Sequence, residues 1–249
     1  MTETLTTPTQ FDEAPGLTAR GTIIVIAGRG EAAGVYARFG RRLAADSYRV
    51  LVIDATVNDV GAARTGAEAL LCDESLPSPK VLVGSDAGAV LALDLAAASP
   101  GLATALVIVG LPVSPQHVAA GGDAELRSAC PVHRRTLDDG SLVDSGALAR
   151  PLPNGLALPA AGSIHVPVLV IHGEADVVAP FDEVLPYYHA LPHAHILTTV
   201  NGRHDALNDL SHRSVAASIV LFLERVRQGD MLPAVLHRRG ADGVITAAD

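Results

Sequence analysis

The sequence predicts an α/β protein built on a mostly parallel sheet of about six strands, with helices on both faces. Short β-branched runs alternate with longer segments of helical periodicity from residue 22 to residue 227. Several of these runs are apolar throughout, which is typical of strands that are covered on both faces. A chain of 249 residues with 49% hydrophobic residues is long enough to bury such a sheet in one domain.

The strands are predicted from their β-branched and aliphatic content and from the turn residues that follow them. They occupy residues 22–27, 50–53, 81–83, 105–109, 168–171 and 195–200. The helices are predicted where apolar residues recur three or four positions apart, as Val35, Phe39 and Leu43 do. They occupy residues 33–46, 61–71, the stretch after residue 88 up to about 98, residues 181–191 and residues 207–227.

The alternation breaks once, over residues 112–165, where Pro, Gly, Ser and charged residues dominate and only short helical stretches are predicted. A segment of this length is too long for an ordinary connection. We interpret it as a short cap or lid inserted into a core formed by residues 19–111 and 166–228. Residues 1–18 and 229–249 are predicted to be flexible tails at the two ends.

Composition and charge exclude several classes of function. The net charge of −9 repels phosphate backbones, which disfavours nucleic acid as a partner. No apolar run approaches the length of a membrane span, and the first residues lack the basic and apolar parts of a signal peptide. Two cysteines cannot form a disulfide framework, and the histidines show no metal-ligand spacing. We therefore expect a cytoplasmic protein without metal or cofactor that binds a small molecule, either as a monomer or as a homodimer.

A tight turn of sequence Gly84-Ser85-Asp86-Ala87-Gly88 follows the strand predicted at 81–83. A nucleophile elbow presents one side chain at its apex and requires small residues two positions before and after it. Asp86 at the apex places glycine at both positions, whereas Ser85 at the apex places Val83 inside the turn. The sequence therefore predicts Asp86 as the nucleophile and Ser85 as its neighbour in the pocket. A Ser85 esterase would need the shifted turn, and a plain glycine turn with a helix-capping Asp is the other alternative.

Two later loops carry the residue types that complete such a site. Asp176 follows the strand predicted at 168–171, and His204 follows the strand predicted at 195–200. Both loops lie at the carboxyl ends of parallel strands, where open sheets gather their ligand sites. In the order nucleophile, acid and histidine, these motifs resemble those of the α/β-hydrolase superfamily, and the resemblance covers about residues 20–228.

The resemblance implies a role for each of these residues. Asp86 would be the nucleophile, His204 the base and Asp176 the acid that orients it, while the backbone N–H groups of Arg29 and Ala87 would form the oxyanion hole. Aspartate at the apex resembles the epoxide hydrolases and dehalogenases, which attack an sp³ carbon and then hydrolyse the enzyme ester with activated water. This implies a hydrolase that acts on a small organic molecule such as an epoxide.

The sequence leaves several candidates for the group that stabilises the leaving atom. The chain has no Trp, which dehalogenases use to hold halide, and residues 112–165 contain no Tyr, which epoxide hydrolases use as a proton donor. His133 and Arg134 are candidate donors or substrate clamps, unless they belong to a solvated basic stretch. Arg29 and Glu31 either reach the pocket or form an ion pair at the surface. Lyase or cyclase chemistry and simple ligand binding in the same pocket are alternatives.

Overall fold

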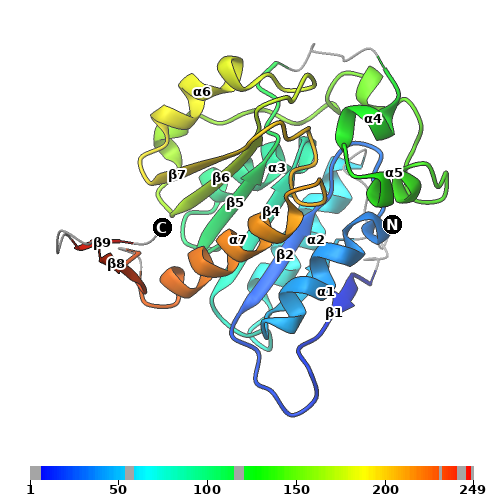
Figure 1. The fold of residues 1–249 in the computed structure, drawn as a ribbon. Coiled ribbons are helices and arrows are strands. Elements are labelled where there is room, and N and C mark those ends of the chain that lie inside the picture. Colours follow the sequence, from blue (N-terminus) through cyan, green and yellow to red (C-terminus); the bar gives the residue numbers. More distant parts are fainter. Residues whose placement is uncertain (1–6, 54–58, 115–120, 230–231, 240–244, 248–249) are drawn as a thin grey trace.

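A computed structural model of the chain describes residues 7–53, 59–114, 121–229, 232–239 and 245–247. Its central sheet has seven strands in the order β1-β3-β2-β4-β5-β6-β7, and all neighbours run parallel except β1 and β3 (Figure 1). The predicted mostly parallel sheet is thus confirmed. The strands are β1 (Thr9–Phe11), β2 (Thr22–Ile26), β3 (Arg49–Val52), β4 (Lys80–Ser85), β5 (Ala105–Val109), β6 (Val168–Gly173) and β7 (Ala194–Thr199).

Helices cover both faces of this sheet. Helices α1 and α7 pack on one face, and α2, α3 and α6 pack on the other (Figure 1). Successive residues of one strand point to opposite layers. Ile23, for example, faces α1 and α7, whereas Ile24 faces the opposite layer. Burial on both sides explains why the strands are apolar throughout. These helices are α1 (Ala37–Ala45), which follows the 3₁₀ turn η1 (Ala33–Tyr36), α2 (Val60–Cys72), α3 (Ala87–Ala98), α6 (Phe181–Ala190) and α7 (His212–Val226).

Strand β1 lies within the residues for which the sequence predicts a tail. It pairs antiparallel with β3 at the sheet edge, and Phe11 lies opposite Val50. The ring of Phe11 covers Gly40 of α1, where a Cβ atom would come within 2.3 Å of it. The tail prediction is therefore wrong for residues 9–11. A strand of three residues is too short to show a periodicity.

The C-terminal residues differ from the prediction in two places. Strands β8 (His237–Arg239) and β9 (Ile245–Ala247) form a separate antiparallel pair within the predicted tail. Helix α7 begins at His212 instead of residue 207, because the residues before it form turns. Within the described ranges, no helix has the length and apolar character that crossing a membrane requires.

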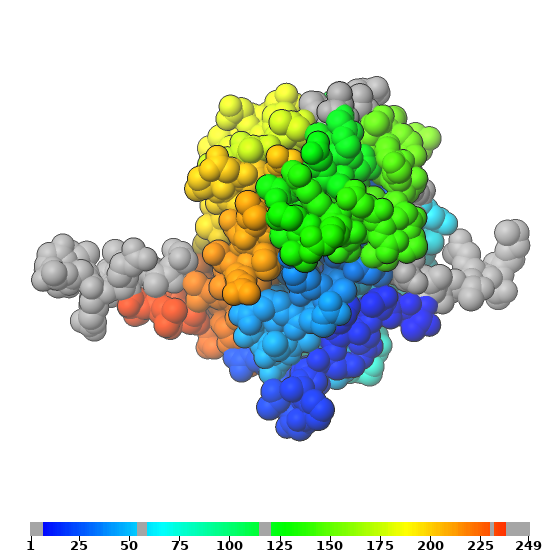
Figure 2. Space-filling model, turned by 45° about the vertical axis from the view of Figure 1, so that its right-hand side comes forward, coloured from blue at the N-terminus to red at the C-terminus, as the bar shows by residue number. Residues whose placement is uncertain are grey.

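The segment predicted as an insertion holds only short helices, and residues 115–120 lie outside the described ranges. Figure 2 shows its green residues at the top of the molecule, beside the orange residues near position 205. Two backbone hydrogen bonds fasten it to the loop after β2, from Asp144 to Gly30 at 2.7 Å and from Ala32 to Leu142 at 2.8 Å. Its elements are α4 (Asp123–Arg127), α5 (Pro131–Leu137), η2 (Ala147–Ala149) and η3 (Ala161–Ser163).

A buried aspartate fastens the same segment to the loop before α7. One carboxylate oxygen of Asp209 accepts hydrogen bonds from Ser128 Oγ at 3.0 Å and from the backbone N–H of Ala129 at 2.7 Å. The other oxygen accepts from the N–H of Arg203 at 2.8 Å. These contacts hold the insertion against the loops that follow β2 and β7. The role of this segment as a lid is still a prediction.

Candidate functional site

Asp86 stands at the turn between β4 and α3 with φ +51° and ψ −122°, a backbone conformation that residues other than glycine rarely adopt. A Cβ atom at Gly84 would lie 2.4 Å from the carbonyl oxygen of Gly88, and one at Gly88 would lie 2.2 Å from that of Ile26. Only glycine fits at both positions, because the clashing atoms belong to the backbone. The structure thus puts Asp86 at the apex and leaves Ser85 as the last, buried residue of β4.

His204 lies between two carboxylates. Its Nδ1 is 2.7 Å from Asp176 Oδ2, and its Nε2 is 3.3 Å from Asp86 Oδ1. The second contact is not aligned as a hydrogen bond, so Nε2 is a buried atom without a hydrogen-bond partner among the described residues. Asp176 is itself oriented by the backbone N–H groups of Val178 and Ala179, at 2.8 and 2.9 Å from Oδ1. The structure therefore brings the predicted nucleophile, base and acid together.

Arg29 holds both oxygens of the Asp86 carboxylate. Its Nε donates to Oδ2 and its Nη2 donates to Oδ1, each at 2.9 Å, and its backbone N–H donates to Oδ2 at the same distance. Nη1 donates to the carbonyl of Arg150, in the insertion, at 2.7 Å. Both charged partners are buried, and charge-assisted bidentate pairs of this kind are among the stronger hydrogen bonds. We call these contacts of the Arg29 side chain with both Asp86 oxygens the Arg29 clamp. The sequence did not predict it.

The two backbone groups expected at the oxyanion hole belong to the loop after β2 and to the start of α3. The N–H of Arg29 reaches Oδ2, as described. Ala87 is the first residue of α3, where a backbone N–H has no acceptor within the helix. Their service as oxyanion donors is part of the proposal below.

A second buried ion pair supports the loop that carries Arg29. Arg127 Nη1 lies 2.5 Å from Glu31 Oε1, and Arg127 Nη2 donates to the carbonyl of Arg29 at 2.6 Å. Glu31 Oε2 accepts from the N–H of Gly28 at 3.0 Å and from the hydroxyl of Tyr36 at 2.5 Å. The interpretation of Arg29 and Glu31 as a surface ion pair is therefore wrong, because each is buried against another partner. Arg127 was missed, since no motif surrounds it in the sequence.

His133 and Arg134 pair with residues other than the predicted nucleophile. His133 Nε2 is 2.7 Å from Asp205 Oδ2, and Arg134 Nε donates to the carbonyl of Ser128 at 2.7 Å. Within the described part of the chain, neither side chain contacts Asp86 or the base beside it. The structure gives no contact that would make either a proton donor or clamp. The interpretation as a solvated stretch is wrong for His133, which is 3% exposed.

Neighbouring charges set the protonation of the site. Burial alone would lower the pKa of His204, but the carboxylates of Asp176 and Asp86 raise this pKa to about 10. Burial alone would raise the pKa of Asp86, yet the charge of Arg29 and the hydrogen bonds around the carboxylate hold this pKa well below its usual value. At neutral pH the site therefore contains an imidazolium between two carboxylates.

We expect the stability that His204 contributes to decline as the pH rises. Because its pKa is higher in the folded chain than in the unfolded chain, the contribution is complete below about pH 6.5 and is lost as the pH rises through 10. Guanidinium unfolding of the wild type and of His204→Gln between pH 6 and pH 10 measures this effect. The stability difference between the two proteins should shrink with increasing pH, and a constant difference would contradict the assigned charge.

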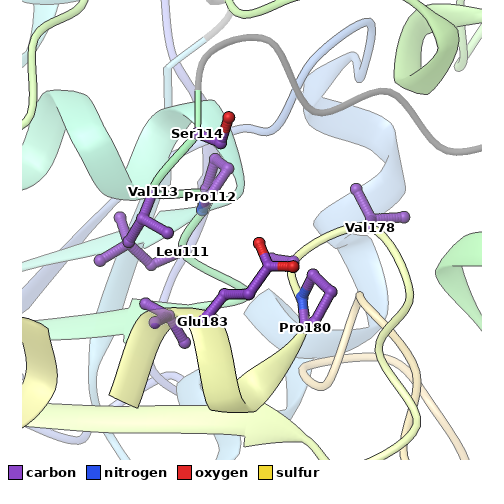
Figure 3. Close-up of a pocket in the computed structure, with 9 residues that line it drawn as sticks. Leu111, Pro112, Val113, Ser114, Val178, Pro180 and Glu183 are labelled. Carbon is purple, nitrogen blue, oxygen red and sulfur yellow. The ribbon is translucent and has the colours of Figure 1, made fainter. Parts of the chain in front are cut away.

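A pocket lies beside the loop that carries Asp176. It lies between the end of β5 and the start of α6, and Figure 3 shows the Glu183 carboxylate among aliphatic and proline side chains. Asp86 and His204 are not part of its wall and are 0% and 1% exposed. A substrate therefore reaches Asp86 only after side chains around the site move. The lining consists of Leu111, Pro112, Val113, Ser114, Val178, Ala179, Pro180, Glu183 and Val184.

Comparison with known proteins identifies the fold. No protein-family model and no curated protein matches the sequence. Among solved structures, a monoacylglycerol lipase of Paleococcus ferrophilus superposes with a TM-score of 0.72 at 17% identity, over 89% of this chain and 98% of that one. A monoglyceride lipase of Saccharomyces cerevisiae gives 0.69 at 14% identity, over 88% and 91%. A proline iminopeptidase of Mycobacterium smegmatis gives 0.67 at 14%, over 89% and 95%. The chain has the α/β-hydrolase fold, and these similar structures belong to hydrolases.

Proposed function

We propose that this chain is a hydrolase in which Asp86 attacks an sp³ carbon, with epoxides as the favoured substrate class. The observation that carries the proposal is Asp86 at the elbow apex, with His204 Nε2 3.3 Å from its carboxylate and without a hydrogen-bond partner. A carboxylate needs no base to attack, so the histidine is free to act on the leaving group and then on water. The lipases and the peptidase of the same fold support hydrolysis in general.

The charge balance of the buried site favours a neutral substrate. Among the groups in the ion pairs of Arg29, Arg127 and His204, three carboxylates (Asp86, Asp176 and Glu31) match three cations, and the buried Asp205 pairs separately with His133. An anionic substrate such as a haloacid adds a charge that has no partner, and an unpaired buried charge costs several kcal/mol. An epoxide adds no charge. The electrostatics therefore favour the epoxide over the haloacid.

In the first step His204 takes the place of the tyrosine donors that the insertion lacks. A carboxylate oxygen of Asp86 bonds to one epoxide carbon, the carbon–oxygen bond of the ring breaks, and the alkoxide takes the proton from His204 Nε2. The proton is next to the nucleophile because Nε2 faces Asp86 Oδ1. The products of this step are a neutral imidazole and a neutral hydroxyalkyl ester on Asp86.

In the second step the neutral imidazole removes a proton from water, and the resulting hydroxide adds to the Asp86 carboxyl carbon. The N–H of Arg29, its guanidinium and the N–H of Ala87 stabilise the oxyanion that forms there. When the intermediate collapses, the alcohol oxygen takes the proton of the new carboxyl group. A diol leaves, and the carboxylate of Asp86 and the imidazolium of His204 are restored.

The Arg29 clamp also favours a second candidate function. Because both oxygens of Asp86 are hydrogen-bonded to Arg29, the carboxylate is a weak nucleophile until Nη2 releases Oδ1. A chain that never releases it would bind a ligand without forming an ester, or would use Asp86 only as a charge. This candidate predicts ligand affinity without hydrolytic turnover that depends on Asp86.

A panel of epoxides, haloacids and activated esters, assayed on the wild type and on Asp86→Asn, separates these functions. We expect epoxide turnover that falls at least about 10³-fold in the variant, because it removes the nucleophile. Ester turnover with labelling of Ser85 by a fluorophosphonate would instead assign the site to a serine esterase. Epoxide turnover at the same rate in both proteins, or binding without any turnover, would contradict the proposal.

A further inference from the structure

A hollow of about 110 Å³ lies between helices α1 and α7, away from the Asp86 site. We call it the α1–α7 hollow. A cavity that holds one water molecule has a volume of about 10–15 Å³. The hollow is several times larger and therefore has room for an ion of several heavy atoms. Its described lining contains no carboxylate and consists of Arg38, Phe39, Arg42, Leu207, His212, Arg213 and Ala216.

Three guanidinium groups and an imidazole gather here in a chain whose net charge is −9. Among the described residues, Arg42 pairs with the partly buried Asp46 at 3.3 Å, and because the Arg42 side chain is about half exposed this pair contributes little. Arg213 is exposed and has no hydrogen bond or ion pair within the described residues. Burial lowers the pKa of His212, and the positive charges of Arg38 and Arg213 lower it further. The described lining of the hollow therefore has an excess of positive charge.

Arg38 supplies a donor that the protein leaves unused. Its Nη2 donates to the carbonyl of Asn208 and its Nη1 lies 3.6 Å from Cys130 Sγ, which fixes the position of the guanidinium. Its Nε is buried and has no hydrogen-bond partner among the described residues. A buried N–H without an acceptor carries a desolvation cost, and an anion in the hollow removes this cost only after the Arg38 side chain turns to expose Nε.

The start of α7 lies at the same place, and the N–H of its first residue, His212, already donates to the carbonyl of Asp209 at 3.1 Å, so the donors left for a ligand are those of the residues that follow. His212 is the first residue of this 15-residue helix, and Arg213 follows it. The first N–H groups of a helix lack acceptors within the helix and carry partial positive charge, which favours anions there. His212 Nδ1 lies 2.9 Å from the carbonyl of Asp209, so Nδ1 carries the proton and the ring orientation is fixed.

We propose that the α1–α7 hollow is a binding site for a tetrahedral oxyanion, either free phosphate or the head of a phosphomonoester. Arg38, Arg42 and Arg213 provide charge-assisted hydrogen bonds to its oxygens, and the imidazole of His212 also lines the site. The apolar part of the lining consists of Phe39, Leu207 and Ala216. It gives an alkyl group attached to the phosphate an apolar surface. The site is separate from the proposed hydrolytic centre and does not depend on it.

Isothermal titration of the full chain with inorganic phosphate and with hexyl phosphate, at constant ionic strength, tests this site. We expect saturable binding that weakens about tenfold in Arg213→Gln and in Arg42→Gln, since each loses one charge-assisted contact. Arg41→Gln is the matched control, because Arg41 is an exposed residue of the same helix that does not line the hollow.

Tighter binding of hexyl phosphate would assign the site to phosphomonoesters, and equal binding would assign it to free phosphate. Both results support the site if the control variant binds as the wild type does. Absence of saturable binding of either compound to the wild type would overturn the proposal. An equal loss of affinity in Arg41→Gln would also overturn it, because the attraction would then reflect general surface charge.

Discussion

The variant His204→Gln should stop turnover and leave an ester on Asp86. The first step slows because the proton donor is gone, but ester hydrolysis loses the base that lies beside Asp86 in the described part of the chain, so the intermediate accumulates. We expect turnover to fall at least about 10³-fold, the size of loss typical when a member of such a triad is removed. Intact-mass spectrometry after incubation with a reactive epoxide should show an addition equal to the mass of the epoxide, and peptide mapping should place it on Asp86.

His133→Gln is the matched control for this variant. His133 is also a buried histidine whose Nε2 pairs with a carboxylate, but that carboxylate belongs to Asp205. We expect this variant to keep most of its turnover and to show no adduct. Equal losses in both variants, without an adduct in either, would mean that His204 acts only through the fold.

The variant Arg127→Met should have the largest effect on stability. It leaves the Glu31 carboxylate buried without its cation, and the removal of one partner from a buried pair costs about 3–5 kcal/mol. The double variant Arg127→Met with Glu31→Gln should recover much of this loss, because the glutamine carries no charge and still accepts from Gly28 and Tyr36. Chemical unfolding of the two single variants and the double variant measures the coupling. Losses that simply add would contradict a strong buried pair.

Features that the sequence could predict are local in the chain. The elbow depends on five consecutive residues, and the glycines at its two ends are fixed by close approach to the backbone. Asp176 and His204 follow strands whose apolar runs are easy to recognise, and parallel pairing brings their loops to one edge of the sheet. The position of Asp86 at the apex and the approach of Asp176 and His204 to it could therefore be predicted from the sequence.

Features that the sequence could not predict depend on contacts between distant residues. Arg127 is 98 residues from Arg29, whose carbonyl it binds, and neither residue has a periodic environment. The direction of the Arg29 side chain is set by Asp86, 57 residues away. Strand β1 forms because Phe11 fits over Gly40, which is a matter of shape. His133 was assigned to the pocket from its neighbours in the chain, although Asp205 determines where it points.

The Arg29 clamp determines how reactive the Asp86 carboxylate is. An aspartate with both oxygens held is stable and weakly reactive, so a substrate must provide the free energy that opens the clamp. In the proposed reaction, relief of ring strain in a neutral epoxide would drive the attack while the buried charges stay balanced.

The covalent role of Asp86 is the central claim, and a single turnover in water labelled with oxygen-18 tests it most directly. Enzyme in excess over epoxide reacts once, and the peptide that contains Asp86 and the diol are then weighed separately. If water attacks the carboxyl carbon of Asp86, the label enters the Asp86 carboxylate and the first diol is formed without it. Label that appears in the diol while Asp86 stays unlabelled would show that water attacks the substrate itself, and the nucleophilic role of Asp86 would be rejected.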